Sequence, residues 1–334
     1  MHRVAASQGV RCWTIAHNAT LGPRLWLSLS TPWRQRLEND RGVVLHLHHS
    51  GELKFHWPWL RNRRFLKKIL QFHLWVTHSK KNAFHRFLYG GVDEIWSSSQ
   101  SAQEQLQKLL PVPAQKFCIV PYGREVTRLL ALRSEKVRRD FRAKLRIPEN
   151  AIVGLTVARF EPIKGVREVF DGFVAVAGQM PQAHLVLVGG PSPENQSAEV
   201  YAHELKQQHQ SLPPEMSARI HFTGFLPQSD EAMAACDYYV LPSYEECMSL
   251  ALLDALILGL PVIGTDAGGT PSVVVTGKTG ILVPARDAGA IGAAIKTMVT
   301  ESQNREQWAA QARLVGAPFD REGIFRSIVK RYLS

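Results

Sequence analysis

The sequence contains the segment Ala151-Ile-Val-Gly-Leu-Thr-Val-Ala158-Arg159-Phe-Glu-Pro-Ile-Lys164-Gly165, which begins with eight apolar or small residues. Those residues predict a buried β-strand, and Gly165 stands before an amphipathic stretch that predicts a helix. Arg159 and Lys164 lie in the turn between them. Two cations with this spacing are common in solvated turns, but beside the N–H groups of a helix start they can bind a diphosphate. We therefore expect an anion site at this strand end.

The alternation of short apolar runs and longer amphipathic stretches continues along the chain, and it is typical of a parallel sheet flanked by helices. The predicted strands are Ala151–Ala158, His184–Val188, Arg219–Phe222, Tyr238–Leu241, Pro261–Thr265 and Gly280–Val283. The predicted helices are 165–178, 198–210, 229–235, 249–259 and 287–300. Ligands of such sheets bind at the carboxyl ends of the strands, so the site should lie in the turns that follow them.

The first part of the chain also predicts an α/β arrangement, although its pattern is less regular. The predicted strands are Arg11–Ala16, Val43–His48, Phe72–Thr77, Glu94–Ser97 and Phe117–Val120. The predicted helices are 59–70 and 100–110. The stretch 124–146, which is rich in Arg and Lys, is expected to join the two parts and to contain a helix.

Length and composition favour a folded protein of two domains, with 334 residues of which 45% are hydrophobic. No apolar run reaches the roughly 18 residues that a membrane-spanning helix needs. The four cysteines are widely separated and form no Cys-x-x-Cys pair. This spacing indicates a reducing compartment and argues against a structural zinc site.

The excess of positive charge is confined to the first part of the chain. Residues 1–125 contain 18 Lys and Arg against 7 Asp and Glu, whereas residues 126–334 contain 22 of each kind. Seven of the eight tryptophans also lie within residues 1–125. Basic residues among aromatic ones suit an anionic membrane surface or a nucleic acid, with a merely solvated basic face as the alternative.

A second motif, Pro242-Ser-Tyr-Glu-Glu246, precedes a predicted helix that contains Asp254, eight residues after Glu246. Two carboxylates at a strand end can accept hydrogen bonds from sugar or ribose hydroxyls. The backbone N–H groups at the start of that helix can hold a phosphate. The residues that would supply them are Met248, Ser249 and Leu250. An isolated acidic residue in such a place is more often a helix cap or a surface charge.

A third motif, Gly268-Gly269, allows the backbone to approach a ligand closely. In this order the three motifs resemble the donor domain of retaining GT-B glycosyltransferases of family 4, and the resemblance covers about residues 72–315. It implies that Arg159 and Lys164 bind the diphosphate of a nucleotide sugar. It also implies an α/β fold of the GT-B type, with two Rossmann-like domains facing across a cleft.

The family's Glu-x7-Glu motif is matched by Glu246 and, with a substitution, by Asp254. The resemblance implies that Glu246 holds donor-sugar hydroxyls and that Asp254 holds the ribose. It places the base near the turn Gly224-Phe225-Leu226. Cys247-Met248-Ser249 replaces the usual Gly-Phe-Gly, and Ser272 stands where the family often has Glu. These departures leave the donor base and sugar open.

In the first part, Leu74-Trp-Val-Thr-His78 resembles the family's strand that ends in an active-site histidine. The resemblance implies that His78 contacts the transferred sugar or the acceptor, with a structural role as the alternative. His46, His48 and His49 are also close in sequence. We expect them to pack or to line a cleft rather than to bind a metal, because no further ligands can be named.

The resemblance implies a domain for the acceptor side in residues 1–145 and a donor-binding domain in residues 146–315. A C-terminal helix in 316–334 would then return to the first domain. Arg11–Ala16 resembles the family's second strand, so the first strand, its loop and most of its helix would be missing. We hypothesise a chain fragment or a gene start assigned too late.

The expected reaction is transfer of a sugar from a nucleoside diphosphate sugar to a glycan or lipid-linked hydroxyl acceptor, with retention, in bacterial polysaccharide or lipopolysaccharide synthesis. Arg159, Lys164 and helix N–H groups would replace a metal ion, so we expect no metal and no cofactor. The basic, Trp-rich stretch 57–68 predicts a cytoplasmic protein held peripherally on the inner face of the plasma membrane.

Three alternatives remain open at this stage. A nucleotide-sugar hydrolase or epimerase would share the donor site but would consume the donor without an acceptor. An inactive remnant would bind the donor only. A nucleic-acid-binding protein would account for the basic first part, but it would leave the ordered donor motifs without a purpose, and no recognised nucleic-acid module is visible.

Overall fold

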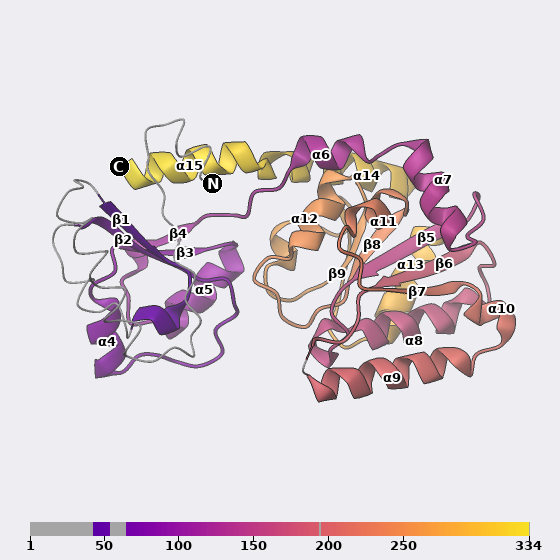
Figure 1. Ribbon diagram of the computed structural model, residues 1–334, viewed down its shortest axis with the longest axis horizontal. Coiled ribbons are helices and arrows are strands. Elements are labelled where there is room, and N and C mark those ends of the chain that lie inside the picture. Colours follow the sequence, from indigo (N-terminus) through magenta and orange to yellow (C-terminus); the bar gives the residue numbers. More distant parts are fainter. Residues whose placement is uncertain (1–42, 54–64, 194, 334) are drawn as a thin grey trace. The chain divides into compact units, whose positions relative to one another are not determined.

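The computed structural model describes residues 43–53, 65–193 and 195–333 (Figure 1). These residues form two units, one reaching to Gly123 and including Glu322–Ser334, and one made of Arg124–Arg321. The division thus falls after Gly123 and not after residue 145, and the C-terminal part returns to the first unit after Arg321 and not after residue 315.

The earlier boundary arises because the basic stretch packs into the C-terminal unit. It forms α6 (Val126–Ala131) and α7 (Glu135–Lys144). Arg142 of α7 is 2% exposed, and its guanidinium donates to the carbonyl oxygens of Ala235 and Ala151, both at 2.9 Å. It also binds the carboxylate of Asp237 at 2.8 Å, which itself accepts from the backbone N–H of Val153. One side chain therefore ties α7 to the residues that precede Ile152 and Tyr238, where two central strands of the sheet begin.

The six strands of the C-terminal unit are parallel and lie in the order β10-β9-β8-β5-β6-β7 (Figure 1). They are β5 (Ile152–Val157), β6 (Ala183–Val188), β7 (Ile220–Gly224), β8 (Tyr238–Leu241), β9 (Val262–Thr265) and β10 (Gly280–Val283). The helices between and after them are α8 (Val166–Ala177), α9 (Gln196–Gln210), α10 (Pro214–Ser217), α11 (Asp230–Ala234), α12 (Leu250–Ile257), α13 (Ala288–Thr300) and α14 (Ser302–Gly316). The strands and helices predicted from residue 151 onward are confirmed, with ends that differ by a few residues.

The strand order positions the site. The chain runs outward from β5 through β6 and β7, and then returns to the other side of β5 for β8, β9 and β10. Such a reversal leaves a crevice at the carboxyl ends of the two strands where it occurs, here β5 and β8. The turns that follow these strands carry the first and second motifs.

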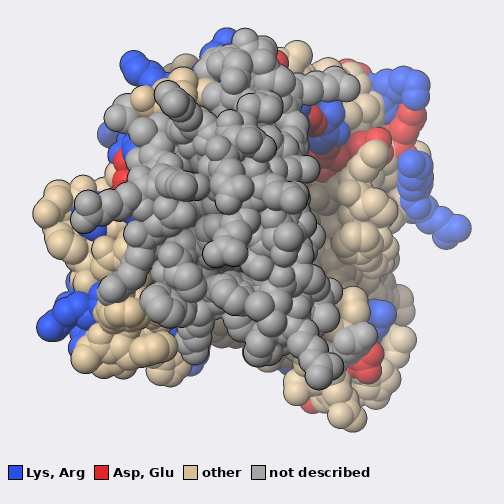
Figure 2. Space-filling view, turned by 60° about the vertical axis from the view of Figure 1, so that its left-hand side comes forward, with Lys and Arg blue, Asp and Glu red and all other residues tan. Residues whose placement is uncertain are grey.

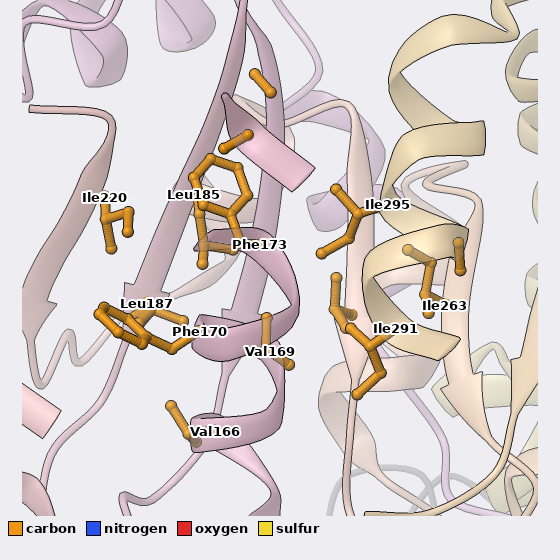
Figure 3. Packing of buried hydrophobic residues seen from close by; sticks show 14 of the residues in the cluster. Val166, Val169, Phe170, Phe173, Leu185, Leu187, Ile220, Ile263, Ile291 and Ile295 are labelled. Carbon is orange, nitrogen blue, oxygen red and sulfur yellow. The ribbon is translucent and has the colours of Figure 1, made fainter. Parts of the chain in front are cut away.

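The core beneath those turns is formed by α8, α13 and the sheet (Figure 3). It includes Phe170 and Phe173 of α8, Leu185 and Leu187 of β6, and Ile291 and Ile295 of α13. The two helices approach closely at Gly172, where a Cβ atom would lie 2.5 Å from the carbonyl oxygen of Ala288. This packing fixes the start of α8, and with it the turn after β5.

The N-terminal unit contains a second parallel sheet in the order β1-β2-β3-β4. Its strands are β1 (Val43–Leu47), β2 (Phe65–Gln71), β3 (Glu94–Ser97) and β4 (Phe117–Ile119), and its helices include α4 (Ala83–Tyr89) and α5 (Gln100–Leu109). Two parallel sheets confirm the α/β fold class. The expected strand Arg11–Ala16 and the inferred loss of the first strand concern residues outside the described ranges.

The predicted helix 59–70 and strand Phe72–Thr77 are wrong where the structure describes them, because β2 spans Phe65–Gln71. Two lysines in the middle of β2 gave the stretch an amphipathic pattern. Lys67 Nζ lies 3.1 Å from Glu94 Oε1, and Lys68 Nζ lies 3.6 Å from Asp93 Oδ2. These acidic partners at the neighbouring strand make both lysines compatible with a sheet.

The C-terminal helix α15 (Arg321–Leu333) completes the N-terminal unit. The ring of Tyr332 stacks on the fully buried Trp96 with centroids 5.8 Å apart. Arg331 Nε donates to Glu94 Oε2 at 2.9 Å. Residues from the end of the chain thus cover one face of the N-terminal sheet.

We expect Arg142→Met to lower the free energy of unfolding by about 2–4 kcal/mol, because it removes the donors of buried carbonyl oxygens and one of the two arginines that bind Asp237. Urea unfolding measures the change. The control is Arg139→Met, which alters an exposed arginine of the same helix and should have almost no effect. Equal losses for the two variants would contradict the role given to Arg142.

Candidate functional site

The first and second motifs meet at the carboxyl ends of β5 and β8. Lys164 Nζ and Glu246 Oε1 lie 2.5 Å apart, although the residues are 82 positions apart in the chain. Ser243 Oγ donates to the same carboxylate oxygen at 3.1 Å. A cation and a carboxylate therefore share one small region of this crevice, as the sequence predicts.

Glycine is required where the two turns touch. Gly165 has φ +65°, and a Cβ atom there would lie 2.2 Å from the carbonyl oxygen of Pro242. The backbone N–H of Tyr244 donates to the carbonyl of Ile163 at 2.9 Å. The turn after β5 is thus packed backbone to backbone against the turn after β8, and this contact places Lys164 beside Glu246.

The third motif supports Glu246 from the other side. Gly268 has φ +56°, and a Cβ atom there would lie 2.0 Å from the carbonyl oxygen of Glu246. That oxygen accepts a hydrogen bond from the N–H of Gly269 at 2.7 Å. The paired glycines therefore hold the backbone of Glu246, a more specific role than the approach to a ligand that was expected.

Arg159 is far more accessible than Lys164 or Glu246, with 61% of its side chain exposed. Its NH1 group donates to Glu161 Oε1 and to Ser192 Oγ, both at 3.1 Å. Ser192 also donates to Glu161. Sequence reasoning missed both partners, although the position of Glu161 in the same turn, two residues after Arg159, was an available signal.

The helix α12 begins directly after this region, with Ser249 as its N-cap. Ser249 Oγ accepts from the N–H of Leu252 at 3.3 Å. The other N–H groups of the first turn have no partner within the helix, which is the feature that binds anions at helix starts. Met248 is buried and Leu250 is 45% exposed. Because both side chains are apolar, these residues can offer only their backbone N–H groups to a phosphate.

Asp254 lies one turn into α12, and it is 7% exposed. Arg124 binds both of its carboxylate oxygens, with Nε to Oδ1 and NH2 to Oδ2 each at 2.5 Å. Burial raises the pKa of Asp254, and the Arg124 guanidinium opposes that rise. No motif or spacing indicates that this carboxylate has an arginine partner 130 residues away.

The turn expected near the base follows β7 at the same edge of the sheet. Gly224 has φ +72°, and its carbonyl oxygen accepts from the N–H of Gly189 at 2.9 Å. Phe225 is 80% exposed, and Leu226 is half-buried. An exposed ring at this edge is available to a ligand that enters along the carboxyl ends of β6 and β7.

In the N-terminal unit, the structure separates His78 from the strand end where it was expected. His78 is exposed, and its Nδ1 lies 2.8 Å from the hydroxyl of the adjacent Thr77. The residue that closely follows β2 is His73. Its Nε2 lies 3.0 Å from His48 Nδ1, and its Nδ1 lies 2.9 Å from the hydroxyl of Tyr122. The expectation for His78 rested on the misplaced strand, and His73 occupies the position it described.

His46 and His48 lie on one face of the sheet, with ring centroids 4.2 Å apart. His46 Nδ1 lies 2.6 Å from the hydroxyl of Tyr332, and burial lowers the pKa of His46 to about 3. Burial, with His48 beside it, also lowers the pKa of His73. Within the described ranges, no group of three His, Cys, Asp or Glu residues is placed to hold a metal ion.

Two units with parallel sheets, one carrying an ordered set of charges at its switch point, define a protein of the GT-B fold. A family model described as glycosyl transferases group 1 matches residues 137–315, more than half of the chain, and the chain belongs to that family.

Solved structures show the same fold. A glycosyltransferase from Rickettsia africae superposes with a TM-score of 0.81 at 13% identity, covering 99% of this chain and 86% of that one. Anabaena HepE, solved in complex with UDP and glucose, gives a TM-score of 0.77 at 19% identity, covering 98% of this chain and 88% of its own.

Curated relatives include D-inositol 3-phosphate glycosyltransferases. The protein of that name from Corynebacterium glutamicum is 27% identical over 221 residues, covering 64% of this chain and 51% of the relative. That from Stackebrandtia nassauensis is 26% identical over 300 residues, covering 86% of this chain and 61% of the relative. This chain therefore spans between about half and three fifths of the length of these relatives.

We expect Gly165→Ala to destabilise the C-terminal unit by about 2–4 kcal/mol, because a Cβ atom would meet the Pro242 carbonyl and would strain a positive φ. Urea unfolding followed by circular dichroism tests this. The control is Gly178→Ala, since Gly178 has open space where the Cβ would lie and no positive φ. Similar stability for the two variants would show that the turn contact is not restrictive.

Proposed function

We propose that this protein is a retaining glycosyltransferase that moves a sugar from a nucleoside diphosphate sugar to a hydroxyl acceptor. The observation that carries the proposal is the meeting of Lys164, Glu246 and the start of α12 at the switch point of the sheet. The group 1 family and the UDP complex of HepE support a nucleotide-sugar donor.

The chemistry follows from the charges. Lys164 is held by Glu246, and Arg159 is held by Glu161, so each cation already has a carboxylate partner. A diphosphate would draw both cations and the free N–H groups of α12 toward its oxygens, which stabilises the negative charge of the leaving group. Glu246 would then accept hydrogen bonds from the donor sugar. Because these groups supply the positive charge, the reaction should need no metal ion and no cofactor.

The acceptor is proposed to be a glycan or a lipid-linked hydroxyl compound of a bacterial surface polysaccharide or lipopolysaccharide. One structural neighbour, WaaG, is a glycosyltransferase involved in lipopolysaccharide biosynthesis, with a TM-score of 0.63 and 18% identity. In the N-terminal unit, His73 is the histidine that we assign to the acceptor side, in place of His78.

The same unit carries a surface suited to anionic lipid. Phe84 and Phe87 of α4 are 56% and 44% exposed, beside Lys80, Lys81 and Arg86. The sequence has no Asp or Glu between Glu52 and Asp93. Figure 2, turned to bring the N-terminal part of the chain forward, shows exposed Lys and Arg side chains beside uncharged ones. We propose that the protein is cytoplasmic and attaches peripherally to the inner face of the plasma membrane.

Across the described ranges, no helix is long and apolar enough to cross a membrane.

A thermal-shift panel of UDP, GDP and ADP and their sugar conjugates, with and without EDTA, tests the donor site. We expect one nucleotide to raise the melting temperature, with an effect that survives EDTA, because a ligand stabilises the state that binds it. Arg159→Ala should abolish the shift, and Lys206→Ala, which alters an exposed lysine of α9, should retain it. No shift with any nucleotide in a folded sample would point to an inactive chain.

Flotation with phosphatidylglycerol vesicles at low salt tests the membrane surface. Lys80→Glu with Lys81→Glu should weaken binding by at least about tenfold, because each lysine near an anionic surface contributes about 1 kcal/mol. The matched control, Arg139→Glu with Lys144→Glu on α7, should bind as the wild type does. Negligible wild-type binding, or tighter binding to duplex DNA, would contradict the proposal.

A further inference from the structure

The ion pair between Arg124 and Asp254 has the geometry of a built contact. Both nitrogens of the guanidinium edge face both carboxylate oxygens at 2.5 Å, and the two side chains are 26% and 10% exposed. A planar, bidentate arginine fixes the plane of a carboxylate as well as its charge. Asp254 is therefore held in one orientation inside the C-terminal unit.

The backbone of Arg124 is fixed equally well. Its N–H donates to the carbonyl of Phe319 at 2.7 Å, and its carbonyl accepts from the N–H of Arg321 at 2.8 Å. These are the segments by which the chain enters and leaves the C-terminal unit. The guanidinium thus projects from a short parallel bridge and not from a free loop.

The charged and titratable groups around Asp254 come from several elements. Besides Arg124, they are Arg128 of α6, Asp230 of α11 and Tyr239 of β8. Arg128 is bound to Asp230. Arg124 is therefore the cation that binds Asp254 directly, and burial would favour the protonated carboxyl without it.

We propose that Arg124 is a positioning residue for the nucleoside part of the donor, because it keeps Asp254 ionised and aims its free lone pairs at the ribose. The inference rests on the proposed function. A carboxylate has about four acceptor positions, and a bidentate arginine uses two, which leaves two for hydroxyl groups. Arg124 acts through Asp254 and needs no contact of its own with the donor.

Calorimetric titration of the full chain tests this, with the nucleoside diphosphate that the thermal-shift panel selects. Arg124→Met should weaken binding about tenfold at neutral pH, since the loss of a charged partner is worth about 1–2 kcal/mol. Arg124→Lys should recover part of the affinity. Inorganic pyrophosphate, which has no ribose, should bind wild type and both variants alike, whereas a general distortion of the site would weaken both ligands.

The pH profile gives a second readout. An ionised Asp254 accepts hydroxyl hydrogen bonds above its pKa, so affinity is lost as the pH falls through that pKa. Burial raises the pKa of Asp254, and Arg124 opposes that rise. In Arg124→Met the pKa of Asp254 should therefore be higher, and this variant should lose its affinity for the nucleotide at a higher pH than the wild type does. The control, Arg128→Met, removes the neighbouring cation bound to Asp230 and should stay within about twofold of wild-type affinity.

The outcomes separate the two proposals. If the wild type binds no nucleotide, the proposed function fails and this inference fails with it. If the wild type binds but Arg124→Met and Arg124→Lys keep its affinity and pH profile, only the role of Arg124 is overturned. Asp254→Asn combined with Arg124→Met should be no weaker than Asp254→Asn alone, and additive losses would also overturn it.

Discussion

The contact between the turn after β5 and the turn after β8 is the constraint on which the candidate site depends. These strands are neighbours in the sheet, so the turns that follow them lie close together. Gly165 lets them touch, because it presents no side chain to the Pro242 carbonyl. The position of Lys164 beside Glu246 is a consequence of that backbone contact. The ion pair itself, between partly exposed side chains, would contribute little to holding the turns together.

A second close backbone contact of this kind involves Glu246 itself, because Gly268 packs against the carbonyl oxygen of Glu246. Backbone contacts thus fix both the turn that precedes Glu246 and the carbonyl of Glu246 itself, whereas its carboxylate is bound by the side chains of Lys164 and Ser243. Under the proposed function, the carboxylate of Glu246 would exchange Lys164 for a sugar hydroxyl while its backbone stays in place.

The C-terminal sheet could be predicted because its strands are buried on both faces and read as continuous apolar runs. β2 could not, because Lys67 and Lys68 are neutralised by Glu94 and Asp93, which follow more than twenty residues later. That single error moved the expected histidine from His73 to His78. Local periodicity carries no information about partners that only the fold brings near.

The same reason explains which site residues were found. Arg159, Lys164 and Glu246 belong to motifs whose order and spacing are visible in the chain, and the fold does bring Lys164 and Glu246 together. Ser192 and Arg124 belong to no motif, and they become recognisable only when the guanidinium or carboxylate they bind is seen. Sequence reasoning therefore pointed to the groups for which we propose a role in ligand binding, and it missed the groups that hold them in place.

The discontinuous N-terminal unit has a consequence for synthesis on the ribosome. The face of its sheet over Trp96 is covered by Tyr332 and its neighbours in α15, which are made more than two hundred residues after Trp96. The C-terminal unit is one continuous stretch of the chain, and all of its residues have been made once Arg321 has been added. The N-terminal sheet, which is translated before the C-terminal unit, should therefore be covered only after that unit is complete, and its apolar face must be kept from other chains until α15 has been made.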